Sequence, residues 1–164
     1  AVDNSHMAAM AASKLTGALP AISGASLTGI TTGKVLQVVQ GTYGSSAVST
    51  STTYATTGLT ADITPSSTSN KILISSCTTA ETNGNAQSGD FAIFRDSTEL
   101  MNTRIYQAAT GGSPANTNAM VYLDSPSSTS SITYTIKLKA TSGSTVVAQR
   151  GTSEGSIVLQ EIVG

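Results

Sequence analysis

The strictest alternation of apolar and polar side chains in this chain is Ile132-Thr133-Tyr134-Thr135-Ile136-Lys137-Leu138-Lys139. Successive side chains of a β-strand point to opposite faces of its sheet. The stretch therefore predicts a strand that buries its isoleucine, tyrosine and leucine side chains and leaves its threonines and lysines in solvent. A helix would repeat its apolar positions every three to four residues instead.

Outward from this stretch, most of the chain repeats the pattern in short segments bounded by Gly, Pro, Asn, Asp or Ser. Such regular spacing is typical of an all-β, antiparallel β-sandwich, which we expect to be jelly-roll-like. We expect strands at residues 34–40, 48–56, 59–63, 71–79, 90–95, 99–106, 119–123, 132–139, 145–149 and 156–162. The predicted core comprises Ile72, Ile74, Phe91, Ile93, Ile132, Tyr134, Ile136 and Leu138.

The last predicted strand, residues 156–162, carries apolar side chains on both faces. Ile157 and Leu159 alternate with Val158 and Ile162. A strand of this kind lies either in the centre of a sheet or at a contact between subunits.

Charge and composition exclude several classes of protein. Charged residues make up 10% of the 164, and the net charge is -1, which excludes a basic nucleic-acid surface and an acidic disordered tail. No apolar stretch approaches the roughly 18 residues of a transmembrane helix, so we expect no membrane insertion. Ser and Thr supply 25 and 26 residues and Trp is absent, a composition that favours strands and turns.

Residues 1–33 differ from the remainder, and we predict a domain boundary between this segment and a β-sandwich head at 34–164. Asp3, Asn4 and Ser5 are suitable caps for a short helix to about Leu15, followed by an extended stretch rich in small residues. Its isolated apolar side chains cannot form a core within one chain, so the segment is either flexible or packed against partner chains. We favour packing against partner chains.

Catalytic candidates are few. The single histidine, His6, lies in this N-terminal segment, so a Ser-His-Asp triad or a histidine metal site on the β domain is excluded. The single cysteine, Cys77, lies in a predicted strand as a small apolar residue. Glycoside hydrolysis needs only two carboxylates, but the chain lacks the tryptophan that commonly stacks on a sugar. We therefore expect no enzyme and no cofactor. The carboxylates weighed are Asp62, Glu81, Asp90, Asp96, Glu99, Asp124, Glu154 and Glu161.

Two predicted loops, residues 81–87 and 107–118, carry more amide side chains than a connector needs. Amides both donate and accept hydrogen bonds, which suits sugar hydroxyls or a polar surface glycan. The alternative, that both loops are only solvated connectors, is equally compatible with the sequence. The candidate receptor-binding residues are Asn83, Asn85, Gln87, Gln107, Asn116 and Asn118.

The order of several short motifs resembles the C-terminal β domain of tailed-bacteriophage tail fibres and other virion surface proteins. The motifs are Gly33-Lys34-Val35-Leu36-Gln37-Val38-Val39, Thr57-Gly58-Leu59, Ile63-Thr64-Pro65-Ser66-Ser67, Asn70-Lys71-Ile72-Leu73-Ile74, Arg95-Asp96-Ser97-Thr98, Tyr122-Leu123-Asp124-Ser125-Pro126, Ser131-Ile132-Thr133-Tyr134 and the strand from Ile157 to Ile162. Upstream, the stretch from Leu15 to Ile22 is similar to fibre shaft linkers.

This resemblance implies a non-enzymatic, homotrimeric structural protein of the virion. It would be assembled in the host cytoplasm with other virion proteins and exposed on the particle exterior, where loops between strands contact the host. A capsid decoration (cement) protein at a threefold site is the alternative, and a bacterial adhesin domain is a more distant one. Residues 1–7 are typical either of native fibre linker, which we favour, or of a cloning scar.

Overall fold

The computed structural model describes residues 34–82, 87–107, 115–141 and 143–164, and within these ranges every regular element is a β-strand. The predicted all-β class is confirmed there. The helical or extended shaft predicted for residues 1–33 lies outside the described residues. The strands are β1 (Val35–Tyr43), β2 (Ala47–Ser49), β3 (Ala55–Ile63), β4 (Lys71–Thr82), β5 (Gln87–Arg95), β6 (Thr98–Gln107), β7 (Asn116–Asp124), β8 (Ile132–Ala140), β9 (Val146–Ala148) and β10 (Gly155–Ile162).

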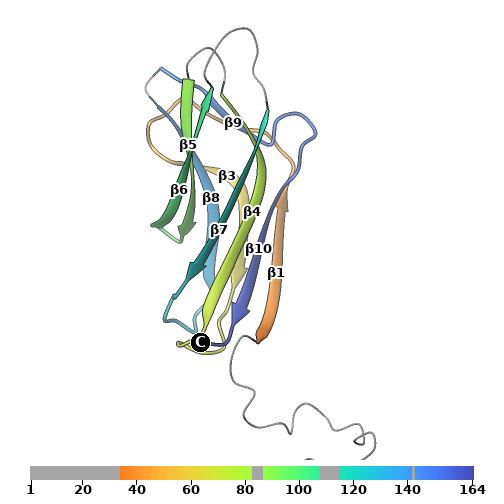
Figure 1. Cartoon of the computed structure of the whole chain (residues 1–164), viewed down its shortest axis with the longest axis vertical. Helices are drawn as coiled ribbons and strands as arrows, with labels where there is room; N and C mark the ends of the chain where they lie inside the picture. The colour runs from red at the N-terminus through yellow and green to blue at the C-terminus, as the bar shows by residue number, and fades with distance from the viewer. Residues whose placement is uncertain (1–33, 83–86, 108–114, 142) are drawn as a thin grey trace, which may run out of the picture. The chain divides into compact units, whose positions relative to one another are not determined.

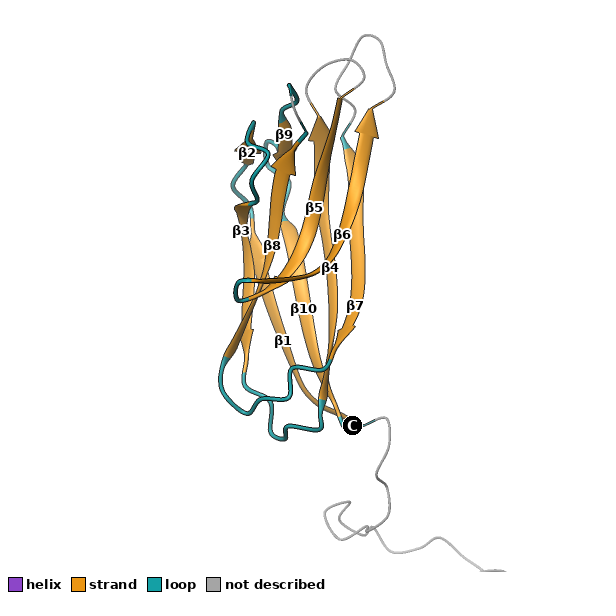
Figure 2. Ribbon diagram, turned by 90° about the vertical axis from the view of Figure 1, so that its left-hand side faces the viewer, coloured by secondary structure: helices purple, strands orange, loops and turns teal. Residues whose placement is uncertain are grey.

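The strands form two antiparallel sheets that pack face to face (Figures 1 and 2). The first sheet has the order β1-β10-β4, and β7 pairs with the other edge of β4. Short strands extend it, because β9 pairs with the last residues of β4 and β2 pairs with β9. The second sheet has the order β3-β8-β5-β6. The predicted antiparallel sandwich is confirmed.

One hydrophobic core lies between the two sheets. In β8, buried residues alternate with half-buried ones from end to end, as its sequence pattern predicts. Leu59 and Met120, which the sequence analysis did not single out, also lie in this core. All eight predicted core residues are buried, namely Ile72, Ile74, Phe91, Ile93, Ile132, Tyr134, Ile136 and Leu138.

Strand β10 lies in the interior of the first sheet, between β1 and β4, which explains its two apolar faces. Ile157 and Leu159 enter the core, while Val158 and Ile162 are half-buried on the outer surface of the sheet. The central position that the sequence allowed is therefore confirmed.

The predicted strand at residues 48–56 is wrong in one respect, because it is two strands in different sheets. Strand β2 ends at Ser49, and β3 begins at Ala55. Between them, Ser49 Oγ accepts a hydrogen bond from the Ser51 amide (3.2 Å), and Ser51 Oγ accepts one from the Thr53 amide (3.0 Å). Hydroxyl groups that bond the backbone two residues ahead compete with strand pairing, so the chain turns here and crosses to the second sheet.

The end of the sandwich where β1 begins and β10 finishes is held by the carboxylate of Glu161. This side chain is buried and accepts hydrogen bonds from the Ser66 amide (2.6 Å), Asn70 Nδ2 (2.6 Å) and Gln37 Nε2 (2.6 Å). Burial acts to raise the pKa of Glu161, but the donors outweigh it and lower that pKa to about 2. The ionised carboxylate therefore joins β1, β10 and the loop before β4.

A second buried carboxylate, Asp124, joins the two sheets near the same end. Arg95 Nη1 donates to both of its oxygens (2.9 Å each), and the Tyr134 hydroxyl donates to Oδ2 (2.6 Å). Burial, followed by this hydrogen bond, raises the pKa of Tyr134. Asp124 stands in β7 of the first sheet, whereas Arg95 and Tyr134 belong to the second.

Candidate functional site

The sandwich has two ends with different roles in the chain (Figure 1). We call one the entry end, because Lys34 leads into β1 there and its carbonyl accepts a hydrogen bond from the Val163 amide (3.0 Å). Strand β4 runs from Lys71, opposite Ile162 at the entry end, to Thr82 at the far end. Twelve residues of strand span roughly 40 Å. The far end, which we call the loop end, is therefore a strand's length from the point of chain entry.

Both polar segments singled out from the sequence connect strands at the loop end. The first joins β4 to β5, and the second joins β6 to β7. Thr82 Oγ1 donates a hydrogen bond to Gln107 Oε1 (3.0 Å), so the end of β4 contacts the end of β6. Asn118 Nδ2 donates to Thr103 Oγ1 (2.9 Å), which ties β7 to β6. The two segments therefore emerge from neighbouring strand ends.

The predicted receptor-binding residues have different roles. Asn83 and Asn85 lie outside the described residues. Gln87 begins β5 and holds the connection before β9, because its Nε2 donates to the Gly143 carbonyl (3.2 Å) and its Oε1 accepts from the Thr145 amide (3.1 Å). Gln107 and Asn118 are buried. Asn116 is exposed at the start of β7. Gln87, Gln107 and Asn118 thus bond to their own chain, and host binding by any of the six stays a prediction.

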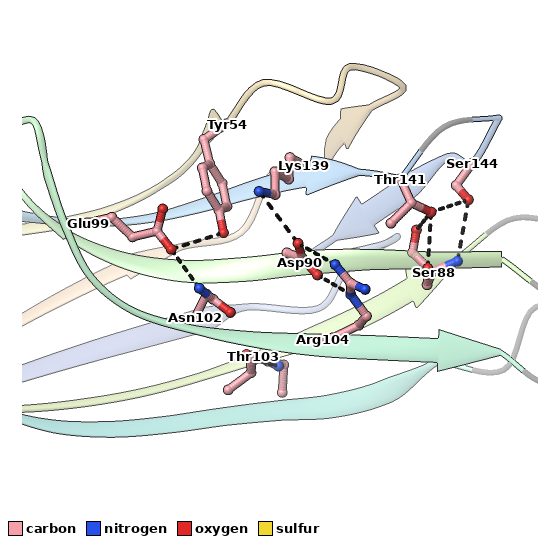
Figure 3. Close-up of polar contacts among 11 residues, drawn as sticks. Tyr54, Ser88, Asp90, Glu99, Asn102, Thr103, Arg104, Lys139, Thr141 and Ser144 are labelled. Carbon is pink, nitrogen blue, oxygen red and sulfur yellow. Dashed lines mark hydrogen bonds and ion pairs between the residues drawn. The ribbon is translucent and has the colours of Figure 1, made fainter.

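Sequence reasoning missed a group of hydroxyls that also stands at the loop end (Figure 3). Thr141 Oγ1 lies 3.0 Å from Ser88 Oγ and 2.9 Å from Ser144 Oγ, and it donates to the Ser88 carbonyl (2.8 Å). These contacts join β5 to the segment that follows β8. Nothing in the local sequence distinguishes these three hydroxyls from the other serines and threonines of the chain.

A buried glutamine near the loop end has no partner for its side chain. Gln149 is fully buried with a φ of 48°, and neither atom of its side-chain amide has a hydrogen-bond partner among the described residues. Its carbonyl accepts from Ser46 Oγ (2.8 Å). Next to it, Arg150 forms an ion pair with the buried carboxylate of Glu81.

The outer surface of the second sheet carries several charged side chains, and we call it the charged outer face: Asp62, Asp90, Glu99, Arg104, Lys137 and Lys139. Arg104 Nε and Nη2 donate to Asp90 (2.6 and 3.1 Å), and Lys139 Nζ lies 3.6 Å from the same carboxylate (Figure 3). The Arg104 hydrogen bond outweighs burial and lowers the pKa of Asp90.

Two aromatic rings complete the charged outer face. Tyr54 packs edge-on against Phe94 with ring centroids 5.1 Å apart, and Lys137 Nζ lies 4.1 Å from the Phe94 centroid. Burial, with the charges of Glu99 and Asp90, raises the pKa of Tyr54 to about 12. These contacts cover Phe94, which is 7% exposed although it points away from the core.

The carboxylates weighed for glycoside hydrolysis mostly have structural partners. Glu81 pairs with Arg150, Asp90 with Arg104 and Asp124 with Arg95. Glu161 accepts from uncharged donors, and Asp62 Oδ1 accepts from Thr133 Oγ1 (2.6 Å).

In the described ranges no surface pocket and no group of three metal-ligating side chains occurs. No helix long and apolar enough to cross a membrane is present in them either.

Compared with known proteins, the chain matches no family model, and no curated protein is significantly similar to it in sequence. The features of this chain that bear on its function are therefore the two ends and the two outer faces of its sandwich.

Proposed function

We propose that this chain is a trimeric structural protein of a bacteriophage virion, of the tail-fibre type, which attaches the particle to the host surface through its loop end. The observation that carries the proposal is the placement of the two amide-rich segments. Both connect strand ends at the loop end, whereas Lys34, the first described residue of the sandwich, lies at the opposite, entry end. A chain anchored through its N-terminal segment would present the loop end outward.

The strand order supports a virion protein. One sheet reads β1-β10-β4-β7 and the other β3-β8-β5-β6, all antiparallel, which is the strand order of a jelly roll. Jelly rolls occur in viral capsid proteins and in lectins. The occurrence in capsid proteins supports a role in a virus particle, and the occurrence in lectins supports recognition of a sugar.

The chemistry of the loop end supports a polar, uncharged ligand such as a surface glycan. The Glu81–Arg150 ion pair there is neutral overall, and the other described side chains include amides and hydroxyls, such as Asn116 and Thr141. Such groups can both donate to and accept from sugar hydroxyls. Three loop ends per trimer would turn weak single contacts into firm attachment, provided that the host presents its ligand densely.

The test is to replace residues 83–86 and 108–114 with Gly-Ser sequences of equal length and to measure adsorption of the particle to host cells. We expect adsorption to be lost, while the mass of the oligomer and its melting temperature stay close to those of the unaltered protein. A matched control replaces residues 127–130, in the entry-end connection between β7 and β8, and should adsorb normally. Unchanged adsorption after both loop-end replacements would contradict attachment through this end and favour capsid decoration.

A further inference from the structure

The outer surface of the first sheet, on the side away from the core, lacks charge. Its outward positions, which we call the uncharged outer face, are Val38, Gln40, Thr42, Leu73, Ser75, Cys77, Thr79, Thr117, Ala119, Val121, Leu123, Ser156, Val158, Gln160 and Ile162. Charges stand at the borders of this face, with Lys71 at the entry end and the Glu81–Arg150 pair beyond Thr79.

Large apolar side chains on this face are left in solvent by the single chain. Val38 is 58% exposed, Val121 is 62% exposed and Leu123 is 48% exposed. These three residues lie on β1 and β7, the two outermost strands of the face, while Val158 and Leu73 are half-buried on the strands between. The apolar side chains therefore continue from one edge of the sheet to the other.

We propose that the uncharged outer face is the surface through which three copies of this chain pack around a common axis. The inference rests on the trimer in the proposed function and names the surface that makes it. Each copy would turn its β1-β10-β4-β7 face toward the axis, so that β1 of one copy meets β7 of the next.

The width of the face fits three copies. Four strands at about 4.8 Å spacing make a face about 19 Å wide. Three such faces around an axis enclose a triangular prism whose centre lies about 5.5 Å from each sheet. Side chains of packed sheets fill about half of a 10 Å separation each, so three faces would fill the space at the axis.

The absence of charge fits a symmetry axis. A charged side chain on this face would appear three times near the axis, in a space from which water is excluded, and like charges there would repel strongly. The charged outer face of the second sheet could not take this position, because the exposed charges of Arg104 and Glu99 would lose solvent in every copy.

The first test introduces a charge at one exposed position on each outer face and measures the mass of the full chain at micromolar concentration. Wild-type protein should have three times the 16.5 kDa mass of the chain. Val121→Glu should reduce the mass to that of one chain. The matched control, Tyr106→Glu, changes a residue that is 63% exposed on β6 of the other sheet and should keep the trimer. A trimeric Val121→Glu protein would overturn the proposal.

The second test needs no variant, because the only cysteine lies within the proposed interface. Cys77 is exposed in the single chain, in one row with Ser156 and Ala119. In the wild-type trimer its thiol should react with Ellman's reagent at least about tenfold more slowly than in urea-unfolded protein, in line with burial that only dissociation relieves. In Val121→Glu the rate should approach the unfolded one.

The outcomes separate this inference from the proposed function. A wild-type trimer in which Cys77 reacts rapidly would overturn the uncharged outer face as the interface and leave the trimer intact. A monomer in which Cys77 reacts slowly would show that another part of the same chain covers the face. A monomer with a reactive Cys77 would overturn the trimer in both proposals, while host attachment would still be decided by the loop-end replacements.

Discussion

Both outer faces of the sandwich are formed by antiparallel strands, but one carries charged side chains and the other carries uncharged ones. On the charged outer face, side chains satisfy one another within the chain. Arg104 and Lys139 surround Asp90, and Tyr54 and Lys137 cover Phe94. On the uncharged outer face, Val38 and Val121 are more than half exposed, and no described segment covers them. This difference is the basis of our proposal that the uncharged outer face, and not the charged one, meets further copies of the chain.

The largest loss of stability should come from the core that both faces share. Ile136 is fully buried between the sheets. Ile136→Ala removes buried methyl and methylene groups and leaves a cavity, so the free energy of unfolding should fall by about 2 to 5 kcal/mol. Chemical denaturation of the wild type and the variant measures this difference in the free energy of unfolding. A loss below roughly 0.5 kcal/mol would mean that the side chain is not packed between the sheets.

The next largest effect is expected at the entry end of the first sheet. Glu161→Gln places an amide group among donors that now bond a carboxylate, so at least one buried donor loses its acceptor. The free energy of unfolding at pH 7 should fall by roughly 1 to 3 kcal/mol. A variant as stable as the wild type at pH 7 would contradict the network of Asn70, Ser66 and Gln37 around this carboxylate.

Glu161 also gives the fold a dependence on pH with a definite sign. Its pKa is about 2 in the folded chain and 4.5 for an ordinary glutamate. The ionised carboxylate thus contributes stability above pH 4.5, and this contribution declines as the pH falls from 4.5 toward 2. Melting temperatures across this range should fall more steeply for the wild type than for Glu161→Gln. Parallel curves would contradict the assignment.

A smaller effect is expected on the charged outer face. Asp90→Asn removes the carboxylate that Arg104 and Lys139 share, and Arg104 is 61% exposed. The free energy of unfolding should fall by about 1 kcal/mol or less, with the difference shrinking in high salt because exposed ion pairs are screened. The oligomer mass should stay unchanged. Dissociation caused by this substitution would reverse the roles assigned to the two faces.

The smallest effect on the fold is expected on the uncharged outer face. Leu123→Ser, studied below the concentration at which the chain associates, should change the free energy of unfolding by less than about 0.5 kcal/mol, because nearly half of this side chain is already in solvent. Association should weaken at higher concentration. A large loss in the monomer would show that Leu123 supports the fold and would remove the need for a partner.

The strands and the core could be predicted from sequence because their signal is local. Alternation in β8 identified Ile132, Tyr134, Ile136 and Leu138 without any knowledge of their neighbours. The break between β2 and β3 could not be predicted. It depends on hydrogen bonds that the hydroxyls of Ser49 and Ser51 accept from the backbone, and these do not alter the alternation of apolar and polar residues.

The structural roles of the amide groups could not be predicted, because amides look alike in a sequence, and host binding by them stays a prediction. Gln107 and Asn118 were expected to bind a receptor, yet they bond to Thr82 and Thr103, which are distant along the chain. The uncharged outer face could not be predicted from the sequence either. Val38, Leu73, Val121 and Val158 are ordinary in their own strands, and they form one surface only when the order of the strands is known.

A crystal structure of the full chain tests the contrast between the two faces most directly. We predict three copies around one axis, with Val38 and Val121 at the contacts between copies, Arg104 and Glu99 in solvent, and the three loop ends on the same side. Single chains with a solvent-exposed uncharged outer face, or a trimer whose contacts run through the charged outer face, would contradict the account.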